Sequence, residues 1–253
     1  MERAFLGGLM LRFRVGALSS FISLLLIWEV ISLPGLLPSP LTTLRYLASL
    51  DPESIALHSI ITLYNSFAGF SLSMLLSLVL GFLSHREELI RGFSMGICSL
   101  FNSTSALIWS LILVSTIGIL SPLPPILVAS AVSLPQLLSA TIAALDSVDK
   151  NLIEAVRSLG GSSVDEYLDV IIPGSLPMII AASRVALGLS LRISVVAEAF
   201  GSSGGIGYMI MRSYNLADAP GVLAWSLILI ALVLALDRLL LMPVEERSSS
   251  WLK

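Results

Sequence analysis

A serine late in the chain lies between glycines at a spacing that is compatible with nucleophilic chemistry. Gly201, Ser203 and Gly205 match the G-x-S-x-G pattern, which in hydrolases exposes a serine nucleophile on a sharp turn. Such a serine needs a general base, which is normally a histidine. The only two histidines, His58 and His85, precede the serine and are expected on opposite sides of a membrane. We therefore interpret the stretch as a glycine-rich turn that lets the backbone pass close to neighbouring helices.

Other catalytic and cofactor motifs are missing from the sequence. Gly201, Ser203 and Gly204 also resemble the serine motif of rhomboid intramembrane proteases, but those enzymes carry their histidine on a later helix, and no histidine follows His85. The chain contains neither a G-x-x-x-x-G-K-[ST] nucleotide-binding loop nor an H-E-x-x-H zinc motif. Cys98 is the only cysteine, so neither an internal disulfide nor a cysteine-based metal cluster can form. We therefore expect no catalytic residue, no metal and no cofactor, and we predict that the chain is not an enzyme.

The composition is that of a polytopic membrane protein. Of its 253 residues, 56% are hydrophobic and 12% are charged, whereas soluble domains carry roughly 25% charged residues. The net charge of −3 argues against nucleic acid as a partner, so the lipid bilayer is the expected surrounding. A helix that crosses a bilayer needs about 17–25 mainly apolar residues. We predict an all-α fold that forms one transmembrane domain over residues 1–253, with six spans at residues 16–33, 60–84, 93–120, 126–145, 175–200 and 222–242.

The loop 147–173 is the longest interior segment that cannot lie in a membrane. A charge at the centre of a bilayer costs about 2.5–3.5 kcal/mol on insertion scales, so a segment with many charges stays in water. The charged side chains in and beside this loop are Asp146, Asp149, Lys150, Glu154, Arg157, Asp165, Glu166 and Asp169.

The first half of this loop has the pattern of a short amphipathic helix. Leu152, Val156 and Leu159 follow one another at i, i+4 and i+7, which places them in one stripe. Asp149 at the start and Arg157 near the end both suit the helix dipole. A helix with an apolar stripe outside the membrane needs a partner that covers the stripe.

Glycine and proline set the expected limits of the helices in this loop. Gly160-Gly161 ends the first helix, because glycine readily adopts the left-handed conformation of a helix C-terminus. Ser163 and Glu166 have the spacing of a capping box, which predicts the start of a second helix. Pro173 and Pro177 are expected to bound that second helix.

The spacing of this loop resembles that of a known family. Glu154-Ala155, Gly160 and the segment 170–173 match the signature E-A-A-x3-G-x9-I-x-L-P, with Val156, Val170 and Ile172 as departures. This signature resembles the cytoplasmic coupling loop of binding-protein-dependent ABC importer permeases, the inner-membrane components of type I importers. The resemblance implies that a separate ABC ATPase subunit docks on the loop. The residues expected to form its docking surface are Leu152, Glu154, Ala155, Val156, Gly160 and Pro173.

Two further stretches support the same resemblance. Trp28-Glu29, followed after a short gap by Leu37-Pro38-Ser39-Pro40, resembles the start of nitrate, taurine and alkanesulfonate permeases. Glu198 and the turn 205–208 resemble the end of the fifth span in the importer family. The resemblance implies a small solute such as one of these anions, delivered by an external substrate-binding protein. It also implies a homodimer, because one chain supplies one coupling loop and each ATPase of a pair needs its own.

The distribution of positive charge predicts the orientation, because Lys and Arg accumulate on the cytoplasmic side. With both termini inside, ten basic residues fall on the inner side and only Arg45 and Arg212 fall on the outer side. This places the loop 147–173 in the cytoplasm of a multi-pass protein in the cell membrane. The inner residues are Arg3, Arg12, Arg14, Arg86, Arg91, Lys150, Arg157, Arg238, Arg247 and Lys253.

Polar residues in the third and fifth spans are candidates for a translocation path. Ser190, Ser194 and Glu198 form a stripe at i, i+4 and i+8, and we expect this stripe to border the path together with Asn102. Arg192 lies on a different face, and our first hypothesis is a buried structural cation. Its expected partner is the acidic side chain of Glu29 or Asp237. The alternative is that the same arginine supplies positive potential for an anionic substrate.

Two other functions compete with the importer hypothesis. An ATP-independent secondary transporter or channel would be favoured by inverted repeats and broken helices, and the sequence shows no convincing repeat. An intramembrane enzyme would need the general base that the sequence lacks.

Overall fold

The computed structural model describes residues 16, 19–20, 22–32, 37–118 and 121–238. The regular elements of this part are helices. A short apolar helix, Ile22–Ile31, comes first. The helices that follow it are α2 (Pro40–Ser49), α3 (Pro52–Arg86), α4 (Glu88–Ser103), α5 (Ala106–Ile117), α6 (Leu123–Asp146), α7 (Lys150–Ser158), α8 (Ser163–Asp165), the π-helix η1 (Glu166–Ile171), α9 (Ile172–Gly201), α10 (Ile206–Asn215) and α11 (Ala219–Leu236).

Most of the predicted spans correspond to helices that are long and apolar enough to cross a membrane. Four helices of the described part meet that condition, and a fifth crossing is possible if α4 and α5 count as one bent span. The first predicted span, 16–33, is represented by the shorter helix Ile22–Ile31, and the end of the sixth lies outside the described residues. The helical membrane fold is thus confirmed, while the count of six spans rests partly on segments outside this description.

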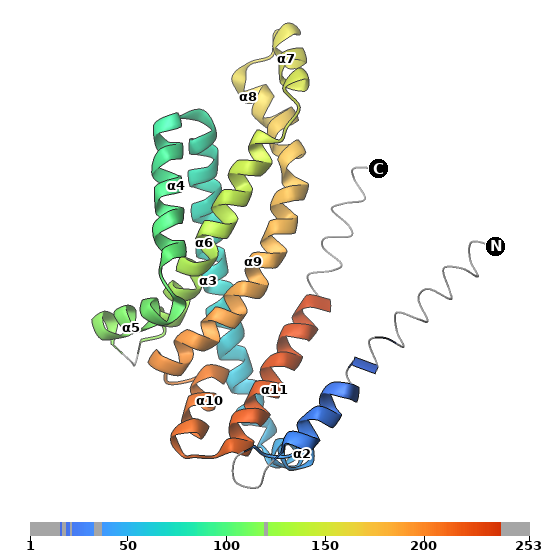
Figure 1. Cartoon of the computed structure of the whole chain (residues 1–253). Coiled ribbons are helices and arrows are strands. Elements are labelled where there is room, and N and C mark those ends of the chain that lie inside the picture. Colours follow the sequence, from blue (N-terminus) through green and yellow to red (C-terminus); the bar gives the residue numbers. More distant parts are fainter. Residues whose placement is uncertain (1–15, 17–18, 21, 33–36, 119–120, 239–253) are drawn as a thin grey trace, which may run out of the picture.

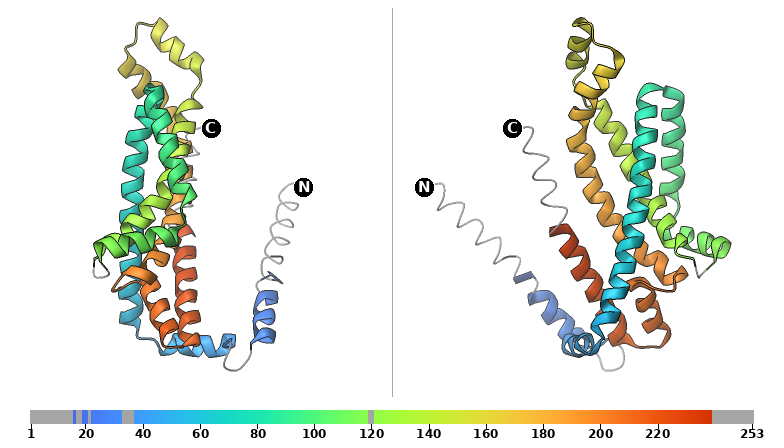
Figure 2. Two further views of the ribbon diagram at one scale, coloured as in Figure 1. Left: turned by 60° about the vertical axis from the view of Figure 1, so that its left-hand side comes forward. Right: turned by 180° about the vertical axis from the view of Figure 1, so that it is seen from behind.

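α3, α4, α6 and α9 lie side by side and form the body of the molecule (Figure 1). α7 and α8 project beyond one end of this body, which we call the loop end, and α2 and α10 lie at the opposite end in every view (Figure 2). α6 is the most buried of the long helices. It packs closely against α3 because a Cβ on Gly69 would come within 2.7 Å of the Ile126 carbonyl oxygen, so only glycine permits this approach.

The third predicted span differs from the structure. Residues 93–120 were predicted to be one span, interrupted by Asn102; in the structure α4 and α5 are separated at Thr104 and Ser105 and are bent by 93°. Both residues are extended, and the Ser105 hydroxyl accepts a hydrogen bond from the Leu107 N–H, which begins a new helix. The Thr104 hydroxyl bonds the Leu100 carbonyl instead. Neighbouring Ser and Thr side chains thus compete with the helical backbone at this point.

The limits expected at Pro173 and Pro177 are also wrong, because both prolines lie inside α9. η1 runs into α9 without a break, so that Ser163–Gly201 is one long helical segment. A proline lacks an N–H and its ring collides with the carbonyl group four residues earlier. The π-helical turn immediately before Pro173 widens the backbone there, which accommodates the ring without ending the helix.

Candidate functional site

The helix α7 begins and ends where the sequence predicts. The Asp149 carboxylate accepts a hydrogen bond from the Asn151 N–H and caps the N-terminus. At the other end Gly160 has φ +84°, the left-handed conformation expected of a helix-ending glycine. The Gly161 N–H then bonds the Val156 carbonyl at 3.0 Å, which closes the turn. α7 is therefore a defined helix at the tip of the loop.

The apolar stripe of α7 is only partly covered by the chain itself. Leu152 is 55% exposed and Leu159 is 89% exposed. Val156 is half-buried, because it lies over the following turn, where a Cβ on Gly161 would come within 2.5 Å of Cγ1 of Val156. The two leucines thus remain as an apolar surface on a helix that projects from the body of the molecule.

The capping box of the second helix is shifted by one residue from the predicted position. Ser162 and Asp165, not Ser163 and Glu166, form the reciprocal pair: the Ser162 N–H donates to Asp165 Oδ2 at 2.7 Å, and the Asp165 N–H donates to Ser162 Oγ. Both pairs have the same spacing in the sequence. The structure uses the first pair, which leaves Glu166 free to contact α7.

An ion pair joins the two halves of the loop. Arg157 Nε donates to Glu166 Oε1 at 2.6 Å, and Nη2 donates to Oε2 at 2.9 Å. The hydrogen bond and charge of Glu166 raise the pKa of Arg157 above its ordinary value. A planar guanidinium that binds both carboxylate oxygens fixes orientation as well as distance. α7 is therefore tied to η1 and, because η1 continues into α9, to the body of the molecule.

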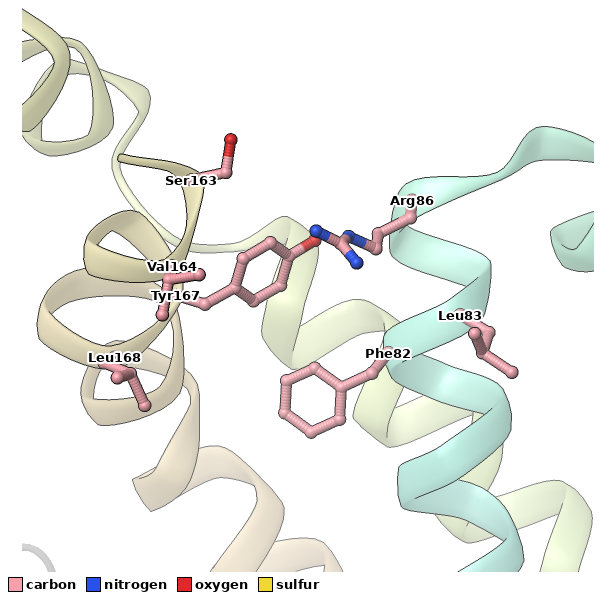
Figure 3. A pocket seen from close by; sticks show the side chains of 7 residues that line it. All are labelled: Phe82, Leu83, Arg86, Ser163, Val164, Tyr167 and Leu168. Carbon is pink, nitrogen blue, oxygen red and sulfur yellow. The ribbon is translucent and has the colours of Figure 1, made fainter. Parts of the chain in front are cut away.

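Tyr167 connects the same loop to α3. Its ring lies between the two segments and points toward Arg86, whose guanidinium carbon is 5.2 Å from the ring centroid (Figure 3). The rings of Phe82 and His85 lie 6.4 and 6.1 Å from that of Tyr167. A groove of about 310 Å³ lies between α3 and the loop, lined by Phe82, Leu83, Arg86, Ser163, Val164, Tyr167 and Leu168.

A second connection lies beside the first, at the end of α6. Asp146 accepts a hydrogen bond from Arg91 Nη2 at 2.6 Å and lies 3.3 Å from His85 Nδ1. Neither this cluster nor the Tyr167 contacts was predicted from the sequence. The signal was the charged segment 85–91 between two apolar spans, but its partners come from segments more than fifty residues away.

The predicted docking residues do not all share one surface. Glu154 and Ala155 are exposed on α7, next to Leu152, and Gly160 ends that helix. Pro173 is exposed in the first turn of α9, which is a different helix. The structure thus groups the residues of α7 and separates the proline from them.

The serine stripe of α9 faces the interior of the chain. Ser190 and Ser194 are fully buried, and Ser190 Oγ donates to the Ser66 carbonyl of α3 at 2.8 Å. We expected these serines to border a path, whereas the structure places them in the packed contact between α9 and α3. Asn102 is exposed near the end of α4, at the bend that breaks the third span.

Glu198 holds the glycine turn at the opposite end of the molecule. Its carboxylate accepts hydrogen bonds from Thr62 Oγ1 at 2.8 Å, Asn65 Nδ2 at 2.9 Å and the Gly207 N–H at 3.1 Å. The Gly205 N–H donates to His58 Nδ1 at 3.1 Å. This nitrogen therefore accepts a backbone hydrogen bond, and the turn has the structural character that we expected.

Arg192, which we expected to be a buried structural cation, is exposed on the single chain. Of its two expected partners, Asp237 pairs with Arg184 at 3.0 Å and Glu29 is exposed on the first helix. In the part of the chain that the structure describes, no acidic side chain forms an ion pair with Arg192. A cation on a lipid-facing surface at mid-membrane costs about 2.5–3.5 kcal/mol.

Comparisons of the sequence and of the fold with known proteins both point to ABC transporters. Residues 73–242 match the family described as "Binding-protein-dependent transport system inner membrane component". A probable ABC transporter permease of Brucella melitensis is 28% identical over 228 residues, which cover 88% of this chain and 92% of that protein. A putative aliphatic sulfonates transport permease of Bacillus subtilis is 29% identical over 234 residues, covering 89% and 83%. The crystal structure of an amino acid ABC transporter with histidines has a similar fold, with a TM-score of 0.66 and 19% identity over 82% of this chain and 97% of that one.

Proposed function

This chain belongs to the family of binding-protein-dependent transport system inner membrane components, and we propose that a separate ABC ATPase drives it by docking on the loop 147–173. It is a membrane transport subunit and not an enzyme. Its solute arrives on an external binding protein, and both termini and the loop 147–173 lie in the cytoplasm. The ten-to-two distribution of basic residues supports this orientation.

The observation that carries the docking proposal is the exposed apolar surface of α7. Leu152 and Leu159 are exposed on a helix that projects beyond the body of the molecule. In water such a surface is unfavourable unless another protein covers it. The helix is also held firmly, because Gly160 ends it and the bidentate ion pair with Glu166 orients it. An ATPase that docks on this apolar surface could move the membrane helix, because the orientation of α7 relative to that helix is fixed.

Contacts within the chain connect α7 to the membrane helices, so that a displacement of α7 by the ATPase would reach them. A displacement of α7 acts on η1 through Arg157 and Glu166, and η1 is continuous with α9. The Tyr167 ring carries the same displacement to Arg86 and Phe82 of α3. α3 and α9 both pack on the central helix α6, so that the loop moves these helices together.

Two copies of the chain form the working permease in this proposal. One chain presents one α7, and the two ATPase subunits of a pair each need such a helix. We further propose small anionic solutes, with sulfonates as the first candidates, because the relative in Bacillus subtilis is described as an aliphatic sulfonates permease. A secondary transporter would need no docking surface, so the exposed leucines favour the ATP-driven alternative.

Uptake into proteoliposomes tests this proposal. The vesicles hold the purified chain with the ABC ATPase and external binding protein encoded in the same genome, and radiolabelled alkanesulfonate or taurine is supplied on the outer side. We expect uptake that requires ATP, the ATPase and the binding protein together. Uptake by the chain alone, without ATP, would show a secondary transporter or channel instead.

A further inference from the structure

Arg192 lies on the face of α9 that the chain leaves uncovered. Ser190 and Ser194 are buried against the rest of the chain, whereas Arg192 is exposed. On a regular helix this arginine is about 200° from Ser190, which places it on the opposite side. It comes nine residues before Gly201, so it lies about 14 Å along the axis from the end of α9. The backbone of Arg192 is therefore deep inside the membrane-spanning part of the helix.

The neighbouring residues of this face leave open space. Gly188 lies one turn before Arg192, and a Cβ built on it would meet no atom within 4 Å. Val185, another turn earlier, is 58% exposed. A strip of α9 that contains a valine, a glycine and an arginine is thus open along the helix. The glycine widens the space directly beside the cation.

Contact with lipid tails does not suit this cation. Intramembrane charges are costly and generally face a bundle interior, a partner charge or a water-filled cavity. In the described part of the chain Arg192 makes no ion pair, and Asp237, one of the two partners expected from the sequence, pairs with Arg184. The surroundings that stabilise the guanidinium are therefore supplied from outside a single chain.

We propose that Arg192 stands in the solute path between two copies of the chain and binds the anionic group of the solute. This inference rests on the proposed function, because the path exists only in an assembled permease. A guanidinium presents planar paired donors that match the oxygens of a sulfonate or a similar oxyanion. Gly188 leaves the room in which that oxyanion lies. The twofold symmetry of a homodimer places two such cations along the same path.

Charged thiol reagents measure the proposed potential without a known solute. In a Cys98→Ser background, Gly188→Cys introduces a single thiol beside Arg192, and the assembled complex is treated with anionic and cationic methanethiosulfonates of similar size. We expect the anionic reagent to react faster, and Arg192→Gln to lower the anionic-to-cationic rate ratio on the order of tenfold, given the Coulomb interaction of unit charges a few ångströms apart in water. A Val79→Cys thiol on the exposed face of α3 is the matched control, and its ratio should not respond to Arg192→Gln.

Transport by charge variants is the second measurement. Arg192→Lys should keep part of the uptake of a sulfonate, whereas Arg192→Gln should abolish uptake while the ATPase remains bound and hydrolyses ATP. A thiol at position 188 that no water-soluble reagent reaches would overturn the proposal, as would a rate ratio independent of Arg192 or full uptake by Arg192→Gln. A structural ion pair with the second copy would also overturn it, and would show as loss of the assembled dimer in Arg192→Gln. If the ATPase fails to bind the unmodified chain, the proposed function fails instead, which copurification reveals directly.

Discussion

Arg157 and Glu166 are joined by two parallel hydrogen bonds of 2.6 and 2.9 Å that connect α7 to η1. In our account this pair transmits the movement of the ATPase to α9. Each side chain is held by the other, and the carboxylate is almost fully covered although the guanidinium is largely exposed. The pair is thus a mechanical connection between a projecting helix and a membrane helix, formed by side chains nine residues apart.

Reversing this ion pair tests the connection. Arg157→Glu or Glu166→Arg alone places like charges together, so we expect ATP-driven uptake to fall severalfold while the ATPase still binds. The double variant Arg157→Glu, Glu166→Arg restores opposite charges and should recover part of the uptake. Lys150→Ala is the control, because Lys150 is an exposed cation of the same helix without an ion pair in the described residues. Equal uptake in the single and double variants would contradict the role of the pair.

Gly160 should tolerate few substitutions, because its backbone conformation is unfavourable for other residues. Its φ is +84°, yet a Cβ built on it meets no atom within 4 Å, so backbone strain is the only penalty. An L-residue in this conformation costs roughly 1–2 kcal/mol, and asparagine costs least. We expect ATPase binding and uptake to decrease in the order Gly160→Asn, Gly160→Ala, Gly160→Val.

Gly92→Val is the matched control for this series. Gly92 is likewise open, but it has an ordinary helical conformation in α4. The control should bind the ATPase normally. If Gly160→Val binds as well as Gly92→Val, the left-handed end of α7 is not needed for docking.

Glu198 should stabilise the fold rather than contact the solute. Its carboxylate accepts hydrogen bonds from Thr62, Asn65 and the Gly207 N–H. Glu198→Gln replaces an acceptor with an NH₂ group that faces these donors, so we expect a loss of about 1–3 kcal/mol in the free energy of unfolding. Thermal unfolding in detergent measures the change. Glu53→Gln, at an exposed position of α3, should leave the melting temperature unchanged, and a similar result for both variants would remove Glu198 from this role.

Single-cysteine labelling tests the orientation. Cys98→Ser removes the only thiol, and Ser162→Cys and Ser203→Cys then add one at each end of the molecule, both at exposed positions. In intact cells we expect an impermeant maleimide to label position 203 only. Position 162 should react only with a reagent that crosses the membrane. Reversed labelling would place α7 outside the cell, where no ATP-driven subunit can reach it.

Local features of this chain could be predicted from the sequence, whereas contacts between distant segments could not. The end of α7 at Gly160 follows from glycine's access to the left-handed region, which no neighbour has to supply. The capping box was predicted one residue late because Ser162 and Ser163 have equivalent spacing to an acidic residue. Only the contact of Glu166 with Arg157 separates the two alternatives.

Contacts between distant segments also decide which face of the fifth span, α9, is buried. Helical geometry correctly places Arg192 and Ser190 on opposite faces of α9. Which face of α9 is buried depends on its packing against α3, whose Ser66 carbonyl accepts a hydrogen bond from the Ser190 hydroxyl. The sequence of α9 carries no information on that choice, so the serine stripe was expected at a path and Arg192 in the interior. In the structure the two serines are buried between α9 and α3, and Arg192 is exposed on this chain.

The affinity of the ABC ATPase for the chain tests the central claim most directly. Leu152→Asp and Leu159→Asp place charges on the exposed apolar surface of α7, and Leu89→Asp is the matched control, because Leu89 is 87% exposed at the loop end and Leu159 is 89% exposed. With purified subunits in detergent, we expect the α7 variants to raise the dissociation constant about tenfold or more, as loss of a central apolar anchor does in other interfaces. Leu89→Asp should bind as the unmodified chain does. If Leu152→Asp and Leu159→Asp bind the ATPase as tightly as Leu89→Asp, α7 is not the docking helix.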